Sequence, residues 1–208
     1  MAEVAALPAA SVIVLRDAPL EVLMLRRHST ASFVPNAWVF PGGAVDSSDA
    51  RDSTLATMRV AAARELFEET GIWLGTPPSD AEAKRRALLT GTVAYDELLA
   101  EAPVDLERLI WTSHWITPTG VPKRFDTYFF LTEVSRDVEA SLAGDEASDL
   151  AWIAPETALT TLEMIFPTIK NLEALRGFRN ARELIDSRIG AKIEAIQPRI
   201  VNRKIVLP

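Results

Sequence analysis

The order of apolar and polar positions along the chain predicts a mixture of strands and helices. Apolar runs at 11–15 and 22–25 are separated by Arg16-Asp17-Ala18-Pro19, a pattern typical of two strands joined by a turn. A third strand is expected at 38–40, where Pro41-Gly42-Gly43 stops it. The polar stretch 46–53 is expected to be an exposed loop. Aromatic and β-branched residues predict further strands at 72–74, 109–116, 125–134 and 151–153.

Helical patterns occupy three longer stretches. Ser53 or Asp52 could cap a helix that runs to about Thr70, with Gly71 just past its end. Residues 79–101 are expected to be helical with a break near Thr90-Gly91. Residues 167–189 are expected to form two helices that meet at Gly177, and Pro155 opens a helical turn before them. The alternation indicates an α/β fold with added helices, and no repeat or linker divides it, so 1–208 is expected to be a single domain.

Composition narrows the class of protein. The chain has 208 residues, of which 48% are hydrophobic and 25% charged, as in an ordinary globular domain. No uncharged apolar run reaches the length of a membrane-spanning helix, so no membrane association is expected. The first ten residues contain Glu3 and no basic cluster, which is a poor match to a signal peptide. We therefore expect a cytoplasmic protein.

The residue types that are missing restrict the chemistry. With no cysteine, the chain can form neither disulfides nor thiolate sites, and its two histidines, His28 and His114, cannot make a three-histidine metal site. Any metal site must use carboxylates and carbonyls, which suit magnesium or manganese. The net charge of -7 argues against binding nucleic acid. It is compatible with a small anionic substrate, because clustered carboxylates bind cations that in turn attract phosphates.

The segment from Arg64 to Ile72 is the most informative part of the sequence. At 3.6 residues per turn, Glu65, Glu68 and Glu69 project from one helical face, and Arg64 can pair with Glu68. The opposite face can anchor in a core through Val60, Ala63 and Phe67, and the small Ala61 and Ala62 are expected to leave space for a ligand. An acidic face alone is typical of a solvated helix. The glycines before and after this helix favour a binding site instead.

These residues resemble the signature of the Nudix hydrolase superfamily, G-x5-E-x7-R-E-U-x-E-E-x-G-U, where U is a bulky aliphatic residue. Its second half is matched at every fixed position by Arg64 to Ile72, and Phe40-Pro41-Gly42-Gly43 resembles the usual lead-in. The first half departs from it. Gly43 and Arg64 are 21 positions apart where the signature has 14, and Ala56 stands where the signature has Glu. Asp46, Asp49 or Asp52 could replace that acid, or the acid could be dispensable.

An enlarged box of this kind is similar to one branch of the superfamily, the coenzyme A diphosphatases of the nucleoside diphosphate-linked moiety X motif 19 type. The similarity extends to Trp115-Ile116-Thr117-Pro118, to 124–130 and to Pro167-Thr168. The broader coenzyme A signature is matched in part, at Leu23, Arg27 and 40–43. The resemblance implies a Nudix α/β/α sandwich with a mixed sheet.

The resemblance also implies a set of site residues. Magnesium or manganese would be held by Glu65, Glu68, Glu69 and a carbonyl of Gly42 or Gly43, with Arg64 orienting the carboxylates. The general base would be Glu65 or, in the acidic segment 144–149, Glu146, for which a solvated loop is the plain alternative. Substrate contacts are expected from Arg27, Arg124 and Phe125, and Lys123 could join Arg124 at a 3′-phosphate. Arg27 could instead lie on the surface, Arg124 could pair with Asp126, and Phe125 could belong to the core.

The predicted function is metal-dependent hydrolysis of the diphosphate bond in a nucleoside diphosphate linked to another moiety, with coenzyme A or acyl-coenzyme A as the leading substrate. ADP-ribose or a dinucleotide such as NADH is the first alternative. A non-catalytic Nudix-fold binding module is the second, although it would not need the intact Arg64 and glutamates. Isomerase chemistry of the isopentenyl diphosphate kind would need a catalytic cysteine, and the chain has none. A homodimer is possible, with a contribution from 196–208.

Overall fold

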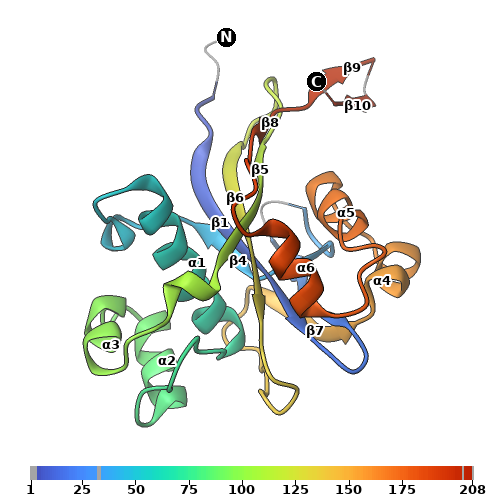
Figure 1. The fold of residues 1–208 in the computed structure, drawn as a ribbon. Coiled ribbons are helices and arrows are strands. Elements are labelled where there is room, and N and C mark those ends of the chain that lie inside the picture. The colour runs from blue at the N-terminus through green and yellow to red at the C-terminus, as the bar shows by residue number, and fades with distance from the viewer. Residues whose placement is uncertain (1–3, 32–33, 203, 208) are drawn as a thin grey trace.

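The computed structural model describes residues 4–31, 34–202 and 204–207, and a mixed β-sheet forms its centre (Figure 1). The strands follow in the order β3-β2-β1-β6-β5-β8, while β4 pairs with β1 and β7 pairs with β2. Their bounds are β1 (Leu7–Arg16), β2 (Glu21–Arg27), β3 (Trp38–Val39), β4 (Gly42–Ala44), β5 (Ile110–Ile116), β6 (Phe125–Glu133), β7 (Ala147–Ile153) and β8 (Ala195–Ile196).

The sheet divides beside β1, where β1 and β2 pair with different strands. β1 pairs in parallel with β6 along its length, from Leu7 to Leu15. Its antiparallel pairing with β2 covers only Leu15 with Val22 and Arg16 with Glu21. Beyond that point β2 pairs with β7, and the short β4 pairs with β1 at Ala9–Ser11. The two halves of the sheet therefore separate on the side where Gly42 and Gly43 lie.

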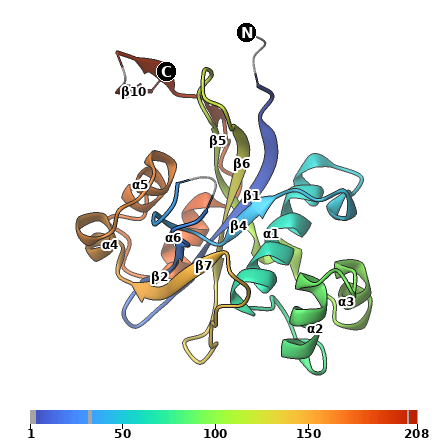
Figure 2. The same ribbon diagram turned by 180° about the vertical axis from the view of Figure 1, so that it is seen from behind.

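Helices cover both faces of the sheet, which confirms the predicted α/β/α sandwich (Figures 1 and 2). Val12 and Val14 of β1 belong to a core under the first helical layer, and Ile13 and Leu15 belong to a second core on the other face. A strand buried on both faces needs such a continuous apolar run. The first layer contains α1 (Thr54–Thr70), α2 (Ala81–Leu89) and α3 (Tyr95–Glu101), and the second contains α4 (Pro155–Thr161), α5 (Phe166–Glu173) and α6 (Ala181–Arg188).

Helix α1 begins and ends where the sequence predicts. The Ser53 side chain accepts a hydrogen bond from the Ala56 N–H at 3.2 Å, which satisfies one of the free donors of the first turn. Gly71 adopts a left-handed conformation with φ 74°, and its N–H donates to the Phe67 carbonyl at 2.9 Å. These two caps fix the helix that carries the three glutamates.

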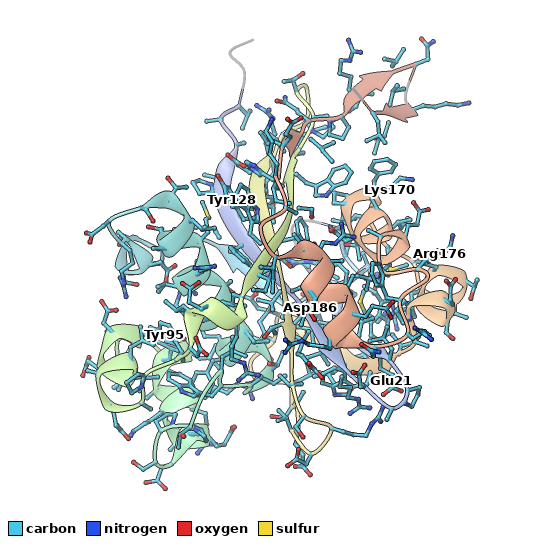
Figure 3. All side chains as sticks on the ribbon, viewed as in Figure 1. Glu21, Tyr95, Tyr128, Lys170, Arg176 and Asp186 are labelled. Carbon is cyan, nitrogen blue, oxygen red and sulfur yellow. The ribbon has the colours of Figure 1, made fainter. Side chains whose placement is uncertain are left out.

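The predicted strand at 72–74 is wrong. Ile72, Trp73 and Leu74 are buried, but they lie in an irregular segment between α1 and α2 and pair with no strand. Helices enclose them instead, and the Trp73 ring packs against the rings of Phe67 and Tyr95 with centroids 4.9 and 5.7 Å apart. Figure 3 shows Tyr95 on the side of the molecule that holds α3. Bulky apolar residues indicate burial here, and burial does not require a sheet.

Two further expectations are corrected. The stretch 46–53 is not simply exposed, because residues 47–49 form a short 3-10 helix in which Asp49 is fully buried. Ala61 and Ala62 leave no space for a ligand, since both have no exposed surface and belong to the core of the first layer. The small side chains let α1 lie close to its neighbours, which is a packing role.

The end of the chain extends away from the layers. After β8, the strands β9 (Arg199–Val201) and β10 (Lys204–Val206) form a two-stranded antiparallel hairpin that projects beyond the end of the sheet (Figure 1). Four apolar side chains of this hairpin are between 42% and 49% exposed: Ile200, Val201, Ile205 and Val206. Within the ranges that the structure describes, no helix is long and apolar enough to cross a membrane.

Candidate functional site

Two glycines bring β4 against both β1 and α1. Gly42 has φ +152°, and a Cβ at this position would lie 2.6 Å from the Ser11 Cα and collide with the Ala10 carbonyl oxygen. A Cβ on Gly43 would lie 2.5 Å from Oε1 of Glu65. The Gly42 N–H donates to Oε2 of Glu69 at 2.8 Å. The Gly-Gly turn therefore places backbone directly on the acidic face of α1, an approach that side chains would prevent.

Arg64 organises the acidic face. Its Nη1 donates to Oε1 of Glu65 and to Oε2 of Glu68, both at 2.9 Å. Its Nε and Nη2 bind the two carboxylate oxygens of Asp49, also at 2.9 Å, and Nη2 donates to the Ala44 carbonyl at 3.0 Å. The predicted pairing of Arg64 with Glu68 is confirmed. One guanidinium thus holds two glutamates in place while it is fixed from behind by Asp49.

Asp49 lies at the spacing of the first glutamate of the signature, the acid whose replacement the sequence alone leaves undecided. It lies six positions after Gly43, which is the Gly-to-Glu spacing of the signature, and the additional residues therefore come between Asp49 and Arg64. Asp46 instead caps the short 3-10 helix by accepting from the Ser48 N–H, and Asp52 lies exposed. Of the three aspartates, Asp49 is the one that contacts Arg64.

The electrostatics of the three glutamates favour added positive charge. Burial raises the pKa of Glu65 to about 7, an effect that Arg64 opposes and the Glu68 carboxylate reinforces. Burial also raises the pKa of Glu69 well above its usual range, with Glu65 adding to the effect. The pKa of Glu68 is raised for the same first reason. Carboxylates held close together in this way are stabilised by a cation as well as by protons.

The donor chemistry of this face fits a hard divalent cation, although the side chains are not arranged as a finished cage. Carboxylate oxygens of three glutamates and the nearby backbone carbonyls are the ligands that magnesium and manganese prefer. Among the residues with described positions, no three acidic or histidine side chains converge as a metal cage. Arg64 holds Glu65 and Glu68, and the Gly42 N–H holds Glu69.

Two adjoining cavities surround these groups. The acidic pocket, of about 370 Å³, is lined by Glu65, Glu68, Glu69, Arg64, 43–46, Leu89, Ala143, Gly144 and Glu146. The large cavity, of about 460 Å³, lies where the sheet divides, and its walls include apolar side chains of Val39, Phe40, Phe125, Phe129 and Ile165. Gly43, Ala44 and Glu146 line both. Glu146 therefore stands where the acidic pocket opens into the large cavity.

Some of the other predicted site residues line the large cavity, and one of them does not. Arg27 and Phe125 line the large cavity, as does Lys123, whose ammonium lies 5.3 Å from the centre of the Phe125 ring. Arg124 is buried and is not part of either cavity lining. Its Nε donates to the Thr117 carbonyl at 3.1 Å and its Nη1 donates to the Val4 carbonyl at 2.7 Å. Asp126, the alternative partner, pairs with His114.

Several polar residues of the large cavity were not predicted as site residues. Ser11 and Thr127 come from neighbouring strands, His28 and Thr30 follow β2, and Thr168 comes from α5. Because the spacing within each segment is unremarkable, only the tertiary arrangement brings them together. The His28 ring has Thr30 Oγ1 at 2.8 Å from Nδ1, so this edge of the cavity carries a small polar group.

Comparisons with known proteins agree with this geometry. Residues 6–172 match the family model described as the NUDIX domain. A Caenorhabditis elegans protein named putative nudix hydrolase 7 is 36% identical over 155 residues, covering 71% of this chain and 51% of the relative. The acyl-coenzyme A diphosphatase NUDT19 of Xenopus laevis is 27% identical over 204 residues, covering 67% of this chain and 54% of the relative. The chain thus spans about half the length of these curated relatives.

A solved structure is similar over most of both chains. The crystal structure of a NUDIX hydrolase from Alicyclobacillus acidocaldarius superposes with a TM-score of 0.80 at 30% identity, and the match covers 89% of this chain and 97% of that one. The cavities described above are therefore built on an architecture that is shared with a known hydrolase.

Proposed function

The chain belongs to the Nudix hydrolase family, and on that premise we propose that it hydrolyses the diphosphate bond of a nucleoside diphosphate linked to another moiety, in a metal-dependent reaction. One observation carries the proposal: the acidic pocket opens into a larger cavity whose walls include both apolar side chains and the cationic side chains of Arg27 and Lys123. The acidic pocket suits a diphosphate that is accompanied by metal ions. The large cavity suits the groups that the diphosphate joins.

We propose that Glu65, Glu68, Glu69 and the Gly43 carbonyl hold one or more magnesium or manganese ions. When bound there, a divalent cation supplies the positive charge that offsets the charge of the diphosphate and makes its phosphorus open to attack. Two features of the protein support this set of ligands. The three carboxylates line one pocket, and burial raises the pKa of each of them, so they have an electrostatic reason to take up cations.

The residues of the chain itself would orient the reactants and move the proton. Arg64 keeps Glu65 and Glu68 facing the pocket. Glu146 stands at the junction of the two cavities and would orient the attacking water and accept its proton, with Glu65 as the alternative base. The water oxygen forms a new bond to one phosphorus as the bond from that phosphorus to the bridging oxygen breaks. The bridging oxygen leaves with the second phosphate.

Coenzyme A or an acyl-coenzyme A is the proposed substrate. Its pantetheine arm is long and partly apolar, which suits walls formed by Phe40, Phe125 and Phe129. Its phosphates would meet Arg27 and Lys123, which line the same cavity. The likeness to the Xenopus laevis protein named acyl-coenzyme A diphosphatase NUDT19 supports this choice. ADP-ribose and NADH-type dinucleotides, which also combine a diphosphate with a bulky group, are the alternatives on the same machinery.

The alternative to a hydrolase is a Nudix-fold module that binds its ligand without turnover. It would need the large cavity but not an arginine that fixes two glutamates beside a third. The intact set of Arg64 and the glutamates it holds favours turnover, because a module that only binds would not need that constellation.

The deciding experiment incubates the purified protein with magnesium or manganese and a panel of coenzyme A, acyl-coenzyme A, ADP-ribose, NADH and nucleoside triphosphates. Products are identified by mass. We expect 3′,5′-ADP and 4′-phosphopantetheine from coenzyme A, lost in Glu68→Gln and Glu69→Gln and retained in the matched control Glu194→Gln, which changes an exposed glutamate. Preference for another diphosphate would replace the substrate and keep the mechanism. Absence of metal-dependent turnover across the panel would favour the binding module.

A homodimer that uses the C-terminal hairpin is a separate proposal about partners. An isolated two-stranded hairpin with four exposed apolar side chains is only marginally stable in water. A second copy that covers β9 and β10 would remove those side chains from solvent. Light scattering at micromolar concentration should give a dimer mass for the full chain and a monomer mass after truncation before Arg199. A monomer mass for the full chain would refute the proposal.

A further inference from the structure

Arg85 is a buried cation that the proposed mechanism does not use. It comes from α2, in the helical segment that separates α1 from β5, and its side chain has no exposed surface. A buried guanidinium is costly unless its donors are satisfied. Within the described part of the chain, the carboxylate that pairs with Arg85 is that of Glu82, which lies 3.7 Å away and is itself 60% exposed. The position of Arg85 therefore has to be explained by what its N–H groups bind.

The first group that Arg85 binds is the end of α1. Its Nε donates to the Glu68 carbonyl at 3.0 Å. That carbonyl lies in the last turn of the helix, where the N–H of Ile72 is directed to the Thr70 hydroxyl at 3.2 Å instead. A cation at the C-terminal end of a helix is also favoured by the helix dipole. Arg85 thus caps the turn that carries Glu68 and Glu69.

The second group is a single residue of the loop between β6 and β7. Nη1 of Arg85 donates to the Ser141 hydroxyl at 3.0 Å, and Nη2 donates to the Ser141 carbonyl at 2.8 Å. The Ser141 N–H in turn donates to the Thr70 carbonyl at 2.9 Å. Gly71 allows this approach, since a Cβ there would lie 3.1 Å from Nη1 of Arg85. One direct hydrogen bond and two from Arg85 therefore fix Ser141 at the end of α1.

From Ser141 the chain leads directly to the acidic pocket. Ala143 and Gly144 line that pocket, and Glu146 lines both cavities. Figure 2 shows the segment before β7 passing beside the end of α1. At its far end the segment is fixed again, because the His28 N–H donates to the Glu146 carbonyl at 2.9 Å. Residues 141–146 therefore span the mouth of the pocket between two anchors, and Arg85 makes the first of them.

We propose that Arg85 is a positioning residue for Glu146: by fixing Ser141 on the end of α1, it sets where the Glu146 carboxylate stands relative to Glu65, Glu68 and Glu69. The helical segment that contains α2 then has a role in the reaction as well as in the core. This inference rests on the proposed catalytic function of Glu146. Arg85 lines neither cavity, so it acts on the rate of the reaction through Glu146 and has no direct contact with substrate.

The anchor can be tested without any activity. Hydrogen exchange resolved at the Ser141 amide should be faster by about tenfold or more in Arg85→Met, because the bond to the Thr70 carbonyl loses its support. Arg85→Lys should also exchange faster, since one ammonium cannot reproduce the fork of three donors. The matched control is Arg86→Met, on the same helix, where the native side chain is 64% exposed and pairs with Glu82. Unchanged exchange at Ser141 in Arg85→Met would overturn the proposal.

The action through Glu146 is tested by kinetics on the substrate that the panel identifies. Arg85→Met should lower kcat by about ten- to a hundredfold, the scale expected when a reacting group is displaced by an ångström, with KM changed less than twofold. In a Glu146→Gln background the same substitution should have little further effect on kcat, because the group it positions is already disabled. Equal losses in both backgrounds would overturn the proposal.

A second variant and the exchange experiment cover the cases in which Arg85→Met does not fold or the native protein shows no turnover. If Arg85→Met does not fold, Ser141→Ala removes one of the three bonds without opening the core, and it should shift exchange and kcat in the same direction by a smaller factor. If the native protein turns over nothing on the panel, the proposed function fails, while the exchange experiment still decides whether Arg85 anchors the loop.

Discussion

Asp49 and Arg64 form a two-point ion pair in which Nε and Nη2 of the guanidinium each lie 2.9 Å from a different oxygen of the carboxylate. The Asp49 side chain is 1% exposed and the Arg64 side chain 9%. The same guanidinium contacts Glu65 and Glu68 on its other side. A residue at the spacing of the first acid in the signature thus supports Arg64 and the glutamates of its second half.

The first prediction concerns this pair. Asp49→Asn should lower the free energy of unfolding by about 3 kcal/mol, because it leaves a buried guanidinium without its main counter-charge. It should also lower kcat by about tenfold, since Arg64 would no longer be held against Glu65 and Glu68. Urea denaturation and steady-state kinetics measure the two effects. Asp52→Asn, at an exposed position, is the control, and equal effects of both substitutions would contradict the assignment of Asp49.

Alanine substitutions at the two glycines of β4 should affect different properties, activity at Gly43 and stability at Gly42. In Gly43→Ala, the new Cβ displaces the flexible carboxylate of Glu65, so we expect metal-dependent activity to fall by about tenfold or more while the fold is retained. In Gly42→Ala, the new Cβ meets backbone of β1 at a φ that other residues rarely adopt, so the loss is one of stability, of about 3 kcal/mol. Thermal denaturation and activity assays on both variants separate these outcomes. A folded, fully active Gly43→Ala protein would be inconsistent with the close approach to Glu65.

The third prediction is a dependence of stability on pH in the metal-free protein. The Glu65 pKa of about 7 lies above its usual value of 4.5, so the folded state binds more protons than the unfolded state between these values. The stabilisation is fully present below pH 4.5 and is lost as the pH rises through about 7, by about 1 kcal/mol per pH unit from this group. The raised pKa of Glu69 acts in the same direction.

Urea denaturation from pH 5 to pH 8, with and without magnesium, measures this dependence. Magnesium should restore stability most strongly at the upper end of the range, where the carboxylates are free of protons. Glu65→Gln should flatten the metal-free curve. A metal-free stability that increases steadily over the same interval would contradict the prediction.

The last prediction separates two neighbouring cations. Lys123→Ala should raise KM for coenzyme A by about fivefold and leave KM for the analogue without the 3′-phosphate unchanged, because Lys123 lies exposed on the large cavity. Arg124→Ala should instead lower the melting temperature, since that side chain holds the carbonyls of Thr117 and Val4. Steady-state kinetics on both substrates and thermal denaturation decide the matter. An equal rise of KM for the two substrates in Lys123→Ala would exclude a contact with the 3′-phosphate.

The helix of the three glutamates was predictable because its determinants are local. Ser53 and Gly71 cap it, and a period of 3.6 residues places Glu65, Glu68 and Glu69 on one face. The same rule misjudged Ala61 and Ala62. Spacing indicates which residues share a face of a helix, but not how many faces are covered, and α1 is covered by both the sheet and α2.

The sequence by itself determined the strands β1, β2, β3, β5, β6 and β7, the capped helix, the acidic face and, through its signature, the family. Each of these depends on residues a few positions apart, whose geometry follows from backbone periodicity. Only the tertiary structure decided that Asp49 supports Arg64, that Arg124 binds backbone carbonyls outside the two cavity linings, and that residues 72–74 are enclosed by helices. These outcomes depend on which distant segments meet, and that is settled by packing over the whole chain rather than by any local pattern.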